Sequence, residues 1–364
     1  MQRKSVLRIV LAVLILLLFL GALAFLFREI QQLQTIVEHL ETQITAVSGI
    51  VSANAESLED IEEISELQNK KFIRTKNEDG TTVITCSLPE LEKEYIFYQL
   101  PLTGNAGGFC YAIEMPNDKL VMIDSGYEGE GYYIRDFIME HGGTVDSWFI
   151  THPHIDHVGG LIDILNDENY SGVIIENIYY NPFTDRFFKE EEEGKDLDFV
   201  NYAVMYEDFK KQMEMCEEIN FIPVEMGDEV IIEDIVVNCL FSFHEDIYDV
   251  NANSLVLHFD IADVTILVTG DITDKTLSVM RQHWGDTNHY FNVDFLQIPH
   301  HGYIAGISND ILFQLTMPEY ALLDCSSEEY QTNAVNILTL SDWVEQLDIP
   351  VLKRFEGPNT IMIK

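Results

Sequence analysis

Three histidines and one aspartate fall within six consecutive positions, at His152, His154, Asp156 and His157. A His-x-His pair can direct two imidazoles at one metal ion, and the adjoining Asp-His pair can offer an oxygen and a nitrogen to a second ion. Two chelating pairs this close together suit a binuclear site, in which the ions lie about 3.5–4 Å apart. The spacing therefore predicts a two-metal centre.

Three other short apolar runs also end in residues that can bind or orient a metal. Each run reads as a strand, so the four strands would deliver their polar residues to one edge of the fold. The residues at the ends of these runs are Asp124, Asp271 and the adjacent pair His300 and His301.

The elements around these residues predict a mixed α/β domain. Short strand-like runs, broken by Gly, Pro, Asn and Asp, alternate with helical stretches such as 132–141 and 202–218. The run before the histidines ends at Thr151, so we expect residues 152–157 to lie in the loop that leaves a strand. Gly159 and Gly160 would let the backbone turn tightly into a helix.

Taken together, these motifs resemble the metallo-β-lactamase superfamily, whose hallmark is His-x-His-x-Asp-His. The resemblance implies an α/β fold of the four-layer αβ/βα sandwich type. Segments 227–228, 251–257 and 299–302 are similar to the extracellular hydrolase domain of ComEC-type competence channel proteins, and related hydrolases include cell-wall phosphorylcholine esterases. The resemblance covers about residues 95–364 and is far more specific for the fold than for the substrate.

The resemblance also implies a ligand set. The ligand just before Gly in the Pro-His-His-Gly turn is assigned to the second ion, although the two histidines of this turn are interchangeable by sequence. The implied ligands are His152 and His154 for the first ion, Asp156, His157 and His301 for the second, and Asp271 as a bridge between the two.

Two residues carry implied catalytic roles and one an implied supporting role. Asp156 would orient the attacking hydroxide, and His300 would donate a proton to the leaving group or contact a substrate oxyanion. Asp124 would orient the ligand loop without binding metal itself.

One position departs from the superfamily pattern. Many members place a further first-metal histidine before the strand that begins near residue 255, and this chain has Asn251 and Asn253 there. These asparagines would contact substrate or support the ligands, and Asn251 could also contact the metal weakly. His244 is an alternative ligand for the first ion, whose fourth ligand the sequence leaves open.

The expected cofactors are two divalent metal ions. Imidazole and carboxylate ligands suit Zn²⁺ first and are also compatible with Mn²⁺ or Fe. Two ions that share a water lower its pKa from about 15.7 toward 7, which creates a hydroxide nucleophile at neutral pH.

The composition argues against a non-specific nucleic-acid coat protein. The chain has 364 residues, with 21 Lys and Arg against 62 Asp and Glu, for a formal net charge of −41. Proteins that grip phosphate backbones do so with clustered basic residues, so this surface should repel polyanions.

The N-terminus predicts a membrane anchor. The 19 residues from Ile9 to Phe27 carry no charge, which is long enough to cross a bilayer core of about 30 Å. Arg3, Lys4 and Arg8 precede this run, so the N-terminus would stay in the cytoplasm and the rest of the chain would lie outside. The alternative is a cleaved secretory signal.

The residues after the anchor predict a helical stalk. From Ile30 to Val51 the apolar residues alternate in steps of three and four, the spacing of a coiled-coil seam. Residues 30–61 would then form a homo-oligomer, or alternatively a single amphipathic helix. The expected organisation is an anchor at 1–28, a stalk at 29–71 and a hydrolase domain at 72–364.

A segment rich in aromatic and acidic residues lies between the histidine loop and Gly227. Its first interpretation is an acidic loop with core aromatics; its second is a lid whose aromatic faces bind a cationic group by cation–π attraction. The aromatic residues are Tyr179, Tyr180, Phe183, Phe187, Phe188, Tyr202, Tyr206 and Phe209.

The sequence therefore predicts a single-pass, membrane-anchored, extracytoplasmic metallohydrolase, most simply a phosphodiesterase acting on a small or cell-envelope ester. The alternative activities are a ComEC-like nuclease and a small-molecule lactonase or β-lactamase. The non-enzymatic alternative is a stalked interaction protein with an inactive hydrolase fold.

Overall fold

The central strands carry apolar side chains on both faces; β5 (Leu120–Ile123) and β14 (Tyr320–Leu323), for example, are buried along their whole length. The computed structural model describes residues 70–88, 91, 93–101, 108–166, 172–192, 199–303, 309–335 and 338–364. In β6 (Thr144–Ile150), Trp148 packs among helix side chains, whereas the next residue, Phe149, packs among side chains of the other sheet. Each such burial stabilises the fold by about 1.5–3 kcal/mol.

The first sheet has nine strands and carries the histidine motif at the carboxyl end of β6. Strands β5 to β8 run parallel, and β18, from the C-terminus, inserts between β2 and β3. The strand order is β1 (Phe72–Lys76), β2 (Thr82–Cys86), β18 (Asn359–Ile363), β3 (Tyr95–Gln99), β4 (Tyr111–Glu114), β5 (Leu120–Ile123), β6, β7 (Ile174–Tyr180) and β8 (Asn220–Pro223).

The second sheet has seven strands and supplies the remaining predicted ligands. Its strands β12, β13, β14 and β17 run parallel, and β9 to β12 form an antiparallel meander. The strand order is β17 (Val351–Lys353), β14 (Tyr320–Leu323), β13 (Phe295–Gln297), β12 (Val264–Val268), β11 (Val256–Ile261), β10 (Ile235–Phe241) and β9 (Glu229–Ile232).

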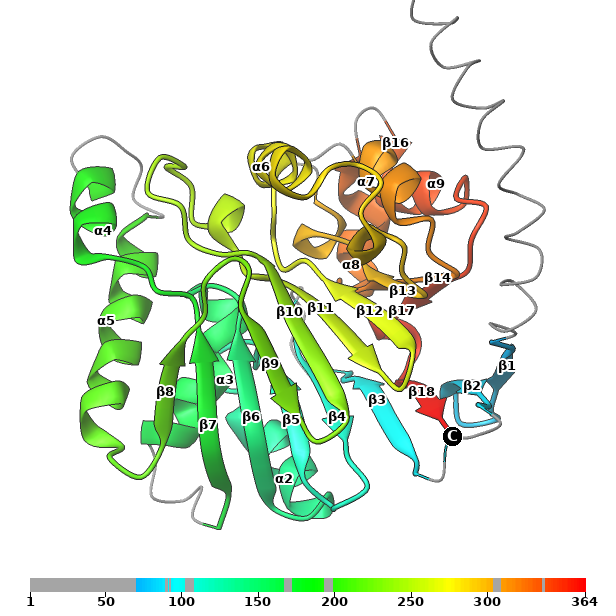
Figure 1. Ribbon diagram of the computed structural model, residues 1–364, viewed down its shortest axis with the longest axis horizontal. Coiled ribbons are helices and arrows are strands. Elements are labelled where there is room, and N and C mark those ends of the chain that lie inside the picture. The colour runs from blue at the N-terminus through cyan, green and yellow to red at the C-terminus, as the bar shows by residue number, and fades with distance from the viewer. Residues whose placement is uncertain are drawn as a thin grey trace, which may run out of the picture. The chain divides into compact units, whose positions relative to one another are not determined.

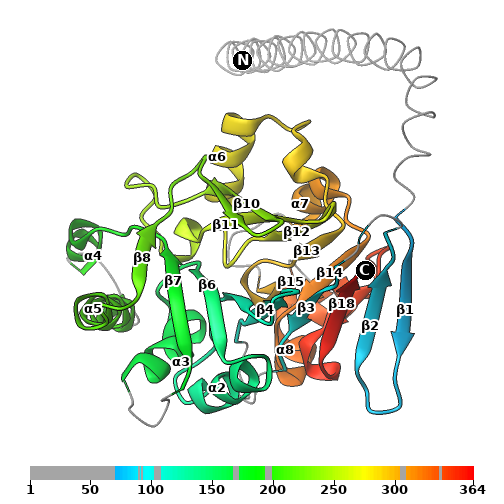
Figure 2. The ribbon, with the colours of Figure 1, turned by 60° about the horizontal axis from the view of Figure 1, so that its bottom comes forward.

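Helices cover the outer faces of both sheets, which gives the predicted four-layer arrangement (Figures 1 and 2). A short hairpin, β15 (Ala334–Val335) and β16 (Leu338–Thr339), precedes the last helix. Helices α2 (Gly131–Glu140), α3 (Ile155–Asn166) and α5 (Phe199–Met215) pack on the nine-stranded sheet, and α6 (Asp274–Trp284) and α7 (Asn309–Thr316) on the seven-stranded sheet; the others are α4 (Asp185–Glu192), α8 (Ser327–Thr332) and α9 (Leu340–Val344).

The histidine motif differs from its expected form in one respect. Helix α3 begins at Ile155, so Asp156 and His157 lie in its first turn and not in a loop. Gly159 and Gly160 are therefore inside the helix. A Cβ on Gly160 would lie 2.2 Å from the carbonyl oxygen of Ser125. These glycines are needed for close packing of α3 against the turn after β5, rather than for a tight turn of their own.

The predicted anchor at 1–28 and nearly all of the stalk at 29–71 lie outside the described residues. The chain divides into two units, Met1–Asn69 and Lys70–Lys364. Within the described part of the chain, the helices are too short or too polar to cross a membrane. The first residue of the second unit, Lys70, forms a salt bridge within that unit: its Nζ lies 2.8 Å from the carboxylate of Asp294.

Candidate metal centre

The carboxylate of Asp271, just beyond β12, lies at the centre of the predicted site. Its Oδ2 is 3.4 Å from Nε2 of His157 and 3.6 Å from Nε2 of His301. The Nε2 atoms of His152 and His300 each lie 3.8 Å from the same oxygen. One buried carboxylate oxygen among four imidazole nitrogens is the placement required of a ligand shared by two ions.

The predicted ligands form two groups, within each of which the metal-binding atoms lie within 4.8 Å of one another. His301, and not His300, belongs to the second group, because its Nε2 lies 3.2 Å from Oδ2 of Asp156. The groups are His152, His154 and Asp271, and Asp156, His157 and His301.

The unpaired atoms of the site test whether metal ions fit there. Nε2 of His152 and Oδ1 of Asp271 are buried, and neither forms a hydrogen bond to any residue that the structure describes. An unsatisfied buried polar atom costs about 1–3 kcal/mol. A cation would remove this cost, and a set of imidazoles and carboxylates suits zinc, manganese or iron. The residues present therefore fit two divalent ions.

Asp124, at the end of β5, orients His157. Its Oδ2 accepts a hydrogen bond from Nδ1 of His157 at 2.7 Å, and its Oδ1 accepts one from the amide of Thr151 at 2.8 Å. Because Nδ1 carries the donated proton, Nε2 is the atom that faces Asp271. Asp124 thus acts from behind the ligand loop, and it is fully buried.

Two hydroxyl groups orient His152, and neither was among the predicted site residues. Nδ1 of His152 lies 3.0 Å from Oγ1 of Thr151 and 3.2 Å from Oγ of Ser254. The Thr151 hydroxyl donates its own proton to Asp124 at 2.6 Å, so it accepts one from His152. Ser254 also accepts a hydrogen bond from the amide of Asp271 at 3.0 Å. Both hydroxyls adjoin the recognised motifs, and that position is the signal that could have identified them.

Carboxylates set the charge of the second group. Burial lowers the pKa of His157, but Asp271, Asp124 and Asp156 together raise it to about 10. The pKa of His301 is likewise raised well above its ordinary value, because Asp271 and Asp156 outweigh the effect of burial. Without metal, these two imidazoles hold protons where a cation would bind.

The first group shows the opposite shift. Burial, with the neighbouring imidazoles, lowers the pKa of His152 well below its ordinary value. Burial also lowers the pKa of His154, to about 3, despite the nearby carboxylates. Both imidazoles are therefore neutral at pH 7, which is the form that binds metal.

Several of these residues have a left-handed backbone. The φ angles are 51° at Asp124, 52° at His300 and 53° at His301. For residues other than glycine this conformation costs about 1–2 kcal/mol each. The fold maintains the strain at the site itself, and the strained turn directs His300 and His301 to different positions.

His300 lies outside both groups but remains beside them. Its Nε2 is 3.4 Å from Nδ2 of Asn251, and its ring centroid is 5.6 Å from that of Tyr303. The side chains of His300 and Asp156 are 18% and 16% exposed, compared with 0–4% for His152, His157 and His301. The two residues expected to act in catalysis are therefore among the more accessible at the centre.

The structure does not bring Asn253 and His244 to the metal groups. Asn253 is fully buried, and its Nδ2 donates to the carbonyl groups of Ile247 and Asp249 at 2.6 and 3.1 Å. Its Oδ1 accepts from the amide of His244 at 2.7 Å, and His244 itself is exposed. Asn253 thus holds a loop, which agrees with a supporting role, and His244 is not part of either group.

The aromatic segment forms a small core and not an open lid. Phe183, Phe187, Phe188 and Tyr206 are only 3–7% exposed and pack on one another. Lys210 already lies 4.9 Å above the ring of Tyr206. The faces of these four rings are occupied by the protein itself, which favours the first interpretation, an acidic loop with core aromatics, over a receptor for a cationic group.

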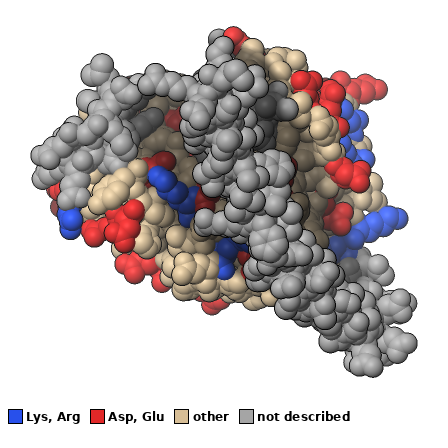
Figure 3. Space-filling view, turned by 90° about the horizontal axis from the view of Figure 1, so that it is seen from above, with Lys and Arg blue, Asp and Glu red and all other residues tan. Residues whose placement is uncertain are grey.

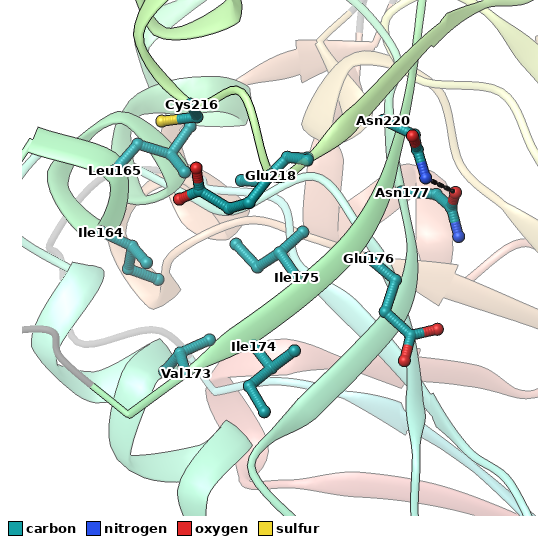
Figure 4. Close-up of a pocket in the computed structure, with 11 residues that line it drawn as sticks. Ile164, Leu165, Val173, Ile174, Ile175, Glu176, Asn177, Cys216, Glu218 and Asn220 are labelled. Atoms are coloured by element: carbon teal, nitrogen blue, oxygen red, sulfur yellow. Dashed lines mark hydrogen bonds between the residues drawn. The ribbon is translucent and has the colours of Figure 1, made fainter.

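Figure 4 shows a cavity of about 600 Å³ whose lining contains none of the predicted metal ligands. Its lining includes Ile175 and Asn177 of β7, which pair with Val145 and Ser147 at the start of β6. The metal ligands follow the opposite end of β6. This cavity is therefore not where the chemistry of the histidine motif takes place.

Comparison with known proteins identifies the family. A family model described as "Metallo-beta-lactamase superfamily" matches residues 103–318, more than half of the chain. The chain belongs to the metallo-beta-lactamase superfamily. This membership and the two donor groups make it a metal-dependent hydrolase at the level of the superfamily. No curated protein matches the chain.

Solved structures with a similar arrangement have little sequence identity to it. The metallo-beta-lactamase fold protein YhfI from Bacillus subtilis is 10% identical, with a TM-score of 0.45, over 72% of this chain and 98% of its own. A metallo hydrolase from the archaeon Ignicoccus hospitalis is 13% identical, with a TM-score of 0.42, over 74% and 99%. CmlA, a diiron β-hydroxylase from Streptomyces venezuelae, is 11% identical, with a TM-score of 0.45, over 75% and 55%.

Proposed function

We propose that this protein is a binuclear metal-dependent phosphodiesterase that acts on a small or cell-envelope ester. The observation that carries the proposal is the position of Asp271, whose single oxygen lies 3.4–3.8 Å from four imidazole nitrogens. When bound, two divalent ions would supply Lewis acidity and lower the pKa of water toward neutrality.

The charge around the centre favours a diester over a monoester. The strongest electrostatic influences on His157, Asp271 and His301 come from other histidines and aspartates of the site, and Lys and Arg are not among them in the described part of the chain. A phosphodiester carries one negative charge, which two metal ions can balance. A dianionic monoester is usually bound with additional basic side chains.

Two side chains of the chain itself have roles in the proposed reaction. Asp156 lies with its carboxylate 3.2 Å from His301, where it accepts hydrogen bonds and orients the attacking group. In the proposed reaction His300, which lies partly exposed beside Asn251, would donate a proton to the departing oxygen.

The overall charge disfavours a polymeric substrate. In the parts of Figure 3 that grey atoms do not cover, acidic side chains lie at the surface on both sides of the view, with basic side chains among them. With a net charge of −41, the protein repels each further phosphate of a long polyanion. The motif similarity to ComEC-type domains is the observation that keeps a nuclease as the second candidate.

We also propose that residues 9–27 anchor the protein in the cell membrane, with the catalytic domain on the extracytoplasmic side. The support is the uncharged run with basic residues before it. Deleting residues 1–28 should move the protein from the membrane fraction to the soluble fraction and leave its activity on small substrates unchanged. Retention in the membrane fraction would contradict the proposed anchor.

The proposed activity is tested with the full chain in detergent, loaded with Zn²⁺ or Mn²⁺. The substrates are bis(p-nitrophenyl) phosphate, p-nitrophenyl phosphate, single-stranded DNA and nitrocefin. We expect hydrolysis of the diester to be fastest, and chelation with EDTA to abolish it. Faster hydrolysis of nitrocefin or of DNA would refute the proposed substrate class.

A further inference from the structure

A fully buried polar cluster lies directly behind the second group of ligands. At its centre is Asp324, which follows β14 and has no exposed surface. Its Oδ1 accepts a hydrogen bond from Nε2 of Gln99 at 3.0 Å, and its Oδ2 accepts one from the hydroxyl group of Tyr111. Burying a carboxylate is costly, and these two hydrogen bonds offset part of that cost.

The backbone of Asp324 contacts a predicted metal ligand. Nδ1 of His301 donates a hydrogen bond to the carbonyl oxygen of Asp324 at 2.8 Å. A carbonyl oxygen can only accept, so Nδ1 keeps its hydrogen, and Nε2, which faces Asp271 and Asp156, is the atom that would give up its proton and bind a metal ion. The position of this one carbonyl group therefore sets both the tautomer and the direction of the ring.

The cluster joins the two sheets. Asp324 follows a strand of the seven-stranded sheet, whereas Gln99 on β3 and Tyr111 on β4 belong to the nine-stranded sheet. The second group is divided in the same way, since His157 follows β6 and His301 follows β13. Apolar contacts between the sheets have little directional preference, whereas hydrogen bonds across them fix one relative position.

Two further contacts from the C-terminal segment reinforce the cluster. Asn359 on β18 donates to Oε1 of Gln99 at 2.6 Å. Arg354 is 3% exposed and donates to the carbonyl group of Gly108 at 3.1 Å. The next residue, Phe109, stacks on His157 with ring centroids 5.3 Å apart. The same buried layer thus contacts both histidines of the second group.

We infer that Asp324, held by Tyr111 and Gln99, is a positioning residue that aligns His301 with the other ligands of the second metal ion. This inference rests on the proposed metal site, and it assigns a function to a cluster that itself touches neither metal nor substrate. Removing one of its hydrogen bonds should weaken binding of the second ion and leave the first unaffected.

The test compares Tyr111→Phe and Asp324→Asn with the control Tyr98→Phe in the full chain. Tyr98 lies next to Gln99, and its hydroxyl group donates to Glu114 at 2.7 Å, so this control removes a comparable hydrogen bond outside the cluster. Competition with a chromophoric chelator gives the two Zn²⁺ dissociation constants. The variant His301→Ala identifies which constant belongs to the second ion.

We expect Tyr111→Phe and Asp324→Asn to raise the Zn²⁺ dissociation constant of the second ion by about 10–100-fold and to leave that of the first ion unchanged. In Tyr98→Phe, both dissociation constants should be unchanged. The inference would be overturned if both cluster variants had the dissociation constants of the wild type. It would also be overturned if the variants weakened the binding of both ions equally. If Asp324→Asn does not fold, the milder Tyr111→Phe decides. A wild-type protein that binds two ions but does not cleave diesters would refute only the proposed substrate.

Discussion

His152 and His157 are both fully buried, with ring centroids 4.1 Å apart, yet their pKa values shift in opposite directions. Burial dominates at His152, whose Nδ1 is held by hydroxyl groups. At His157, carboxylates outweigh burial and raise the pKa to about 10. The placement of carboxylates, and not the depth of burial, therefore decides the charge of each imidazole.

This difference predicts which of the two metal ions binds more tightly. The second group has two carboxylate ligands counting the shared Asp271, and it is backed by Asp124 and Asp324. The first group is backed by neutral hydroxyls and has Asn251 where the superfamily resemblance implies a further histidine. We expect the second ion to bind more tightly than the first.

The largest effect should come from the one residue that the groups share. Asp271→Ala should lose both ions, because the bridging carboxylate serves each of them, and elemental analysis of the purified variant should find almost no metal. Activity on bis(p-nitrophenyl) phosphate should fall by more than about a thousandfold, equivalent to about 4 kcal/mol of transition-state stabilisation.

The matched control for this variant is Asp310→Ala, at an exposed position in the first turn of α7. It should keep about two ions per chain and its full activity. Full metal content in Asp271→Ala would show that Asp271 is not shared by the two ions. The two groups would then be separate sites and not one binuclear centre.

A smaller effect is expected from strengthening the first group. Asn251→His would restore an imidazole beside His300, and we expect the first ion to bind about tenfold more tightly, a gain of about 1.4 kcal/mol. Chelator competition measures this constant. If the dissociation constant of the first ion is unchanged, or if the second ion binds more tightly instead, then Asn251 does not face the first group.

Substrate charge tests whether the metals are the main cations of the site. At low salt, the kcat/KM for a small diester with a cationic leaving group should exceed that for oligonucleotides. Raising the salt toward 0.15 M shortens the Debye length to about 8 Å, which should reduce the ratio between these two kcat/KM values by a few-fold. Rapid DNA cleavage that declines as salt is added would instead indicate a local basic track.

The smallest effect concerns His258, a buried histidine on β11 away from the centre. Burial, with His289, lowers its pKa to about 4, as burial lowers that of His152. The unfolded chain then binds a proton more readily between about pH 6.5 and 4, so stability is lost as the pH falls through this range. In His258→Leu this loss should be smaller, by a few degrees in Tm.

Thermal unfolding of wild type and His258→Leu at pH 7 and pH 4.5 measures this difference. His283→Leu, at an exposed position on α6, is the control and should follow the wild type. Equal loss of Tm at low pH in wild type and His258→Leu would contradict the assignment of His258 as a histidine kept neutral by burial.

The sequence by itself determined the residues that converge at the centre and the class of fold. Apolar strands are followed directly by the ligands, namely His152 to His157, Asp271 and His301. Strands and loops could be predicted here because their patterns depend on residues that are neighbours in the sequence. The departure at Asn251 was also visible without a structure. Asp324 follows an apolar strand as Asp124 does, and this position is the sequence signal that marks it.

The tertiary structure alone decided the relations between distant segments. It separated His301 from His300 through two left-handed residues, turned the aromatic segment into a closed core, and placed Asn253 inside a loop. It also joined Asp324 to Gln99, 225 positions away in the chain. Such contacts depend on how two sheets stack, and the pattern of neighbouring residues records which face of a strand is buried but not which side chains meet across the interface.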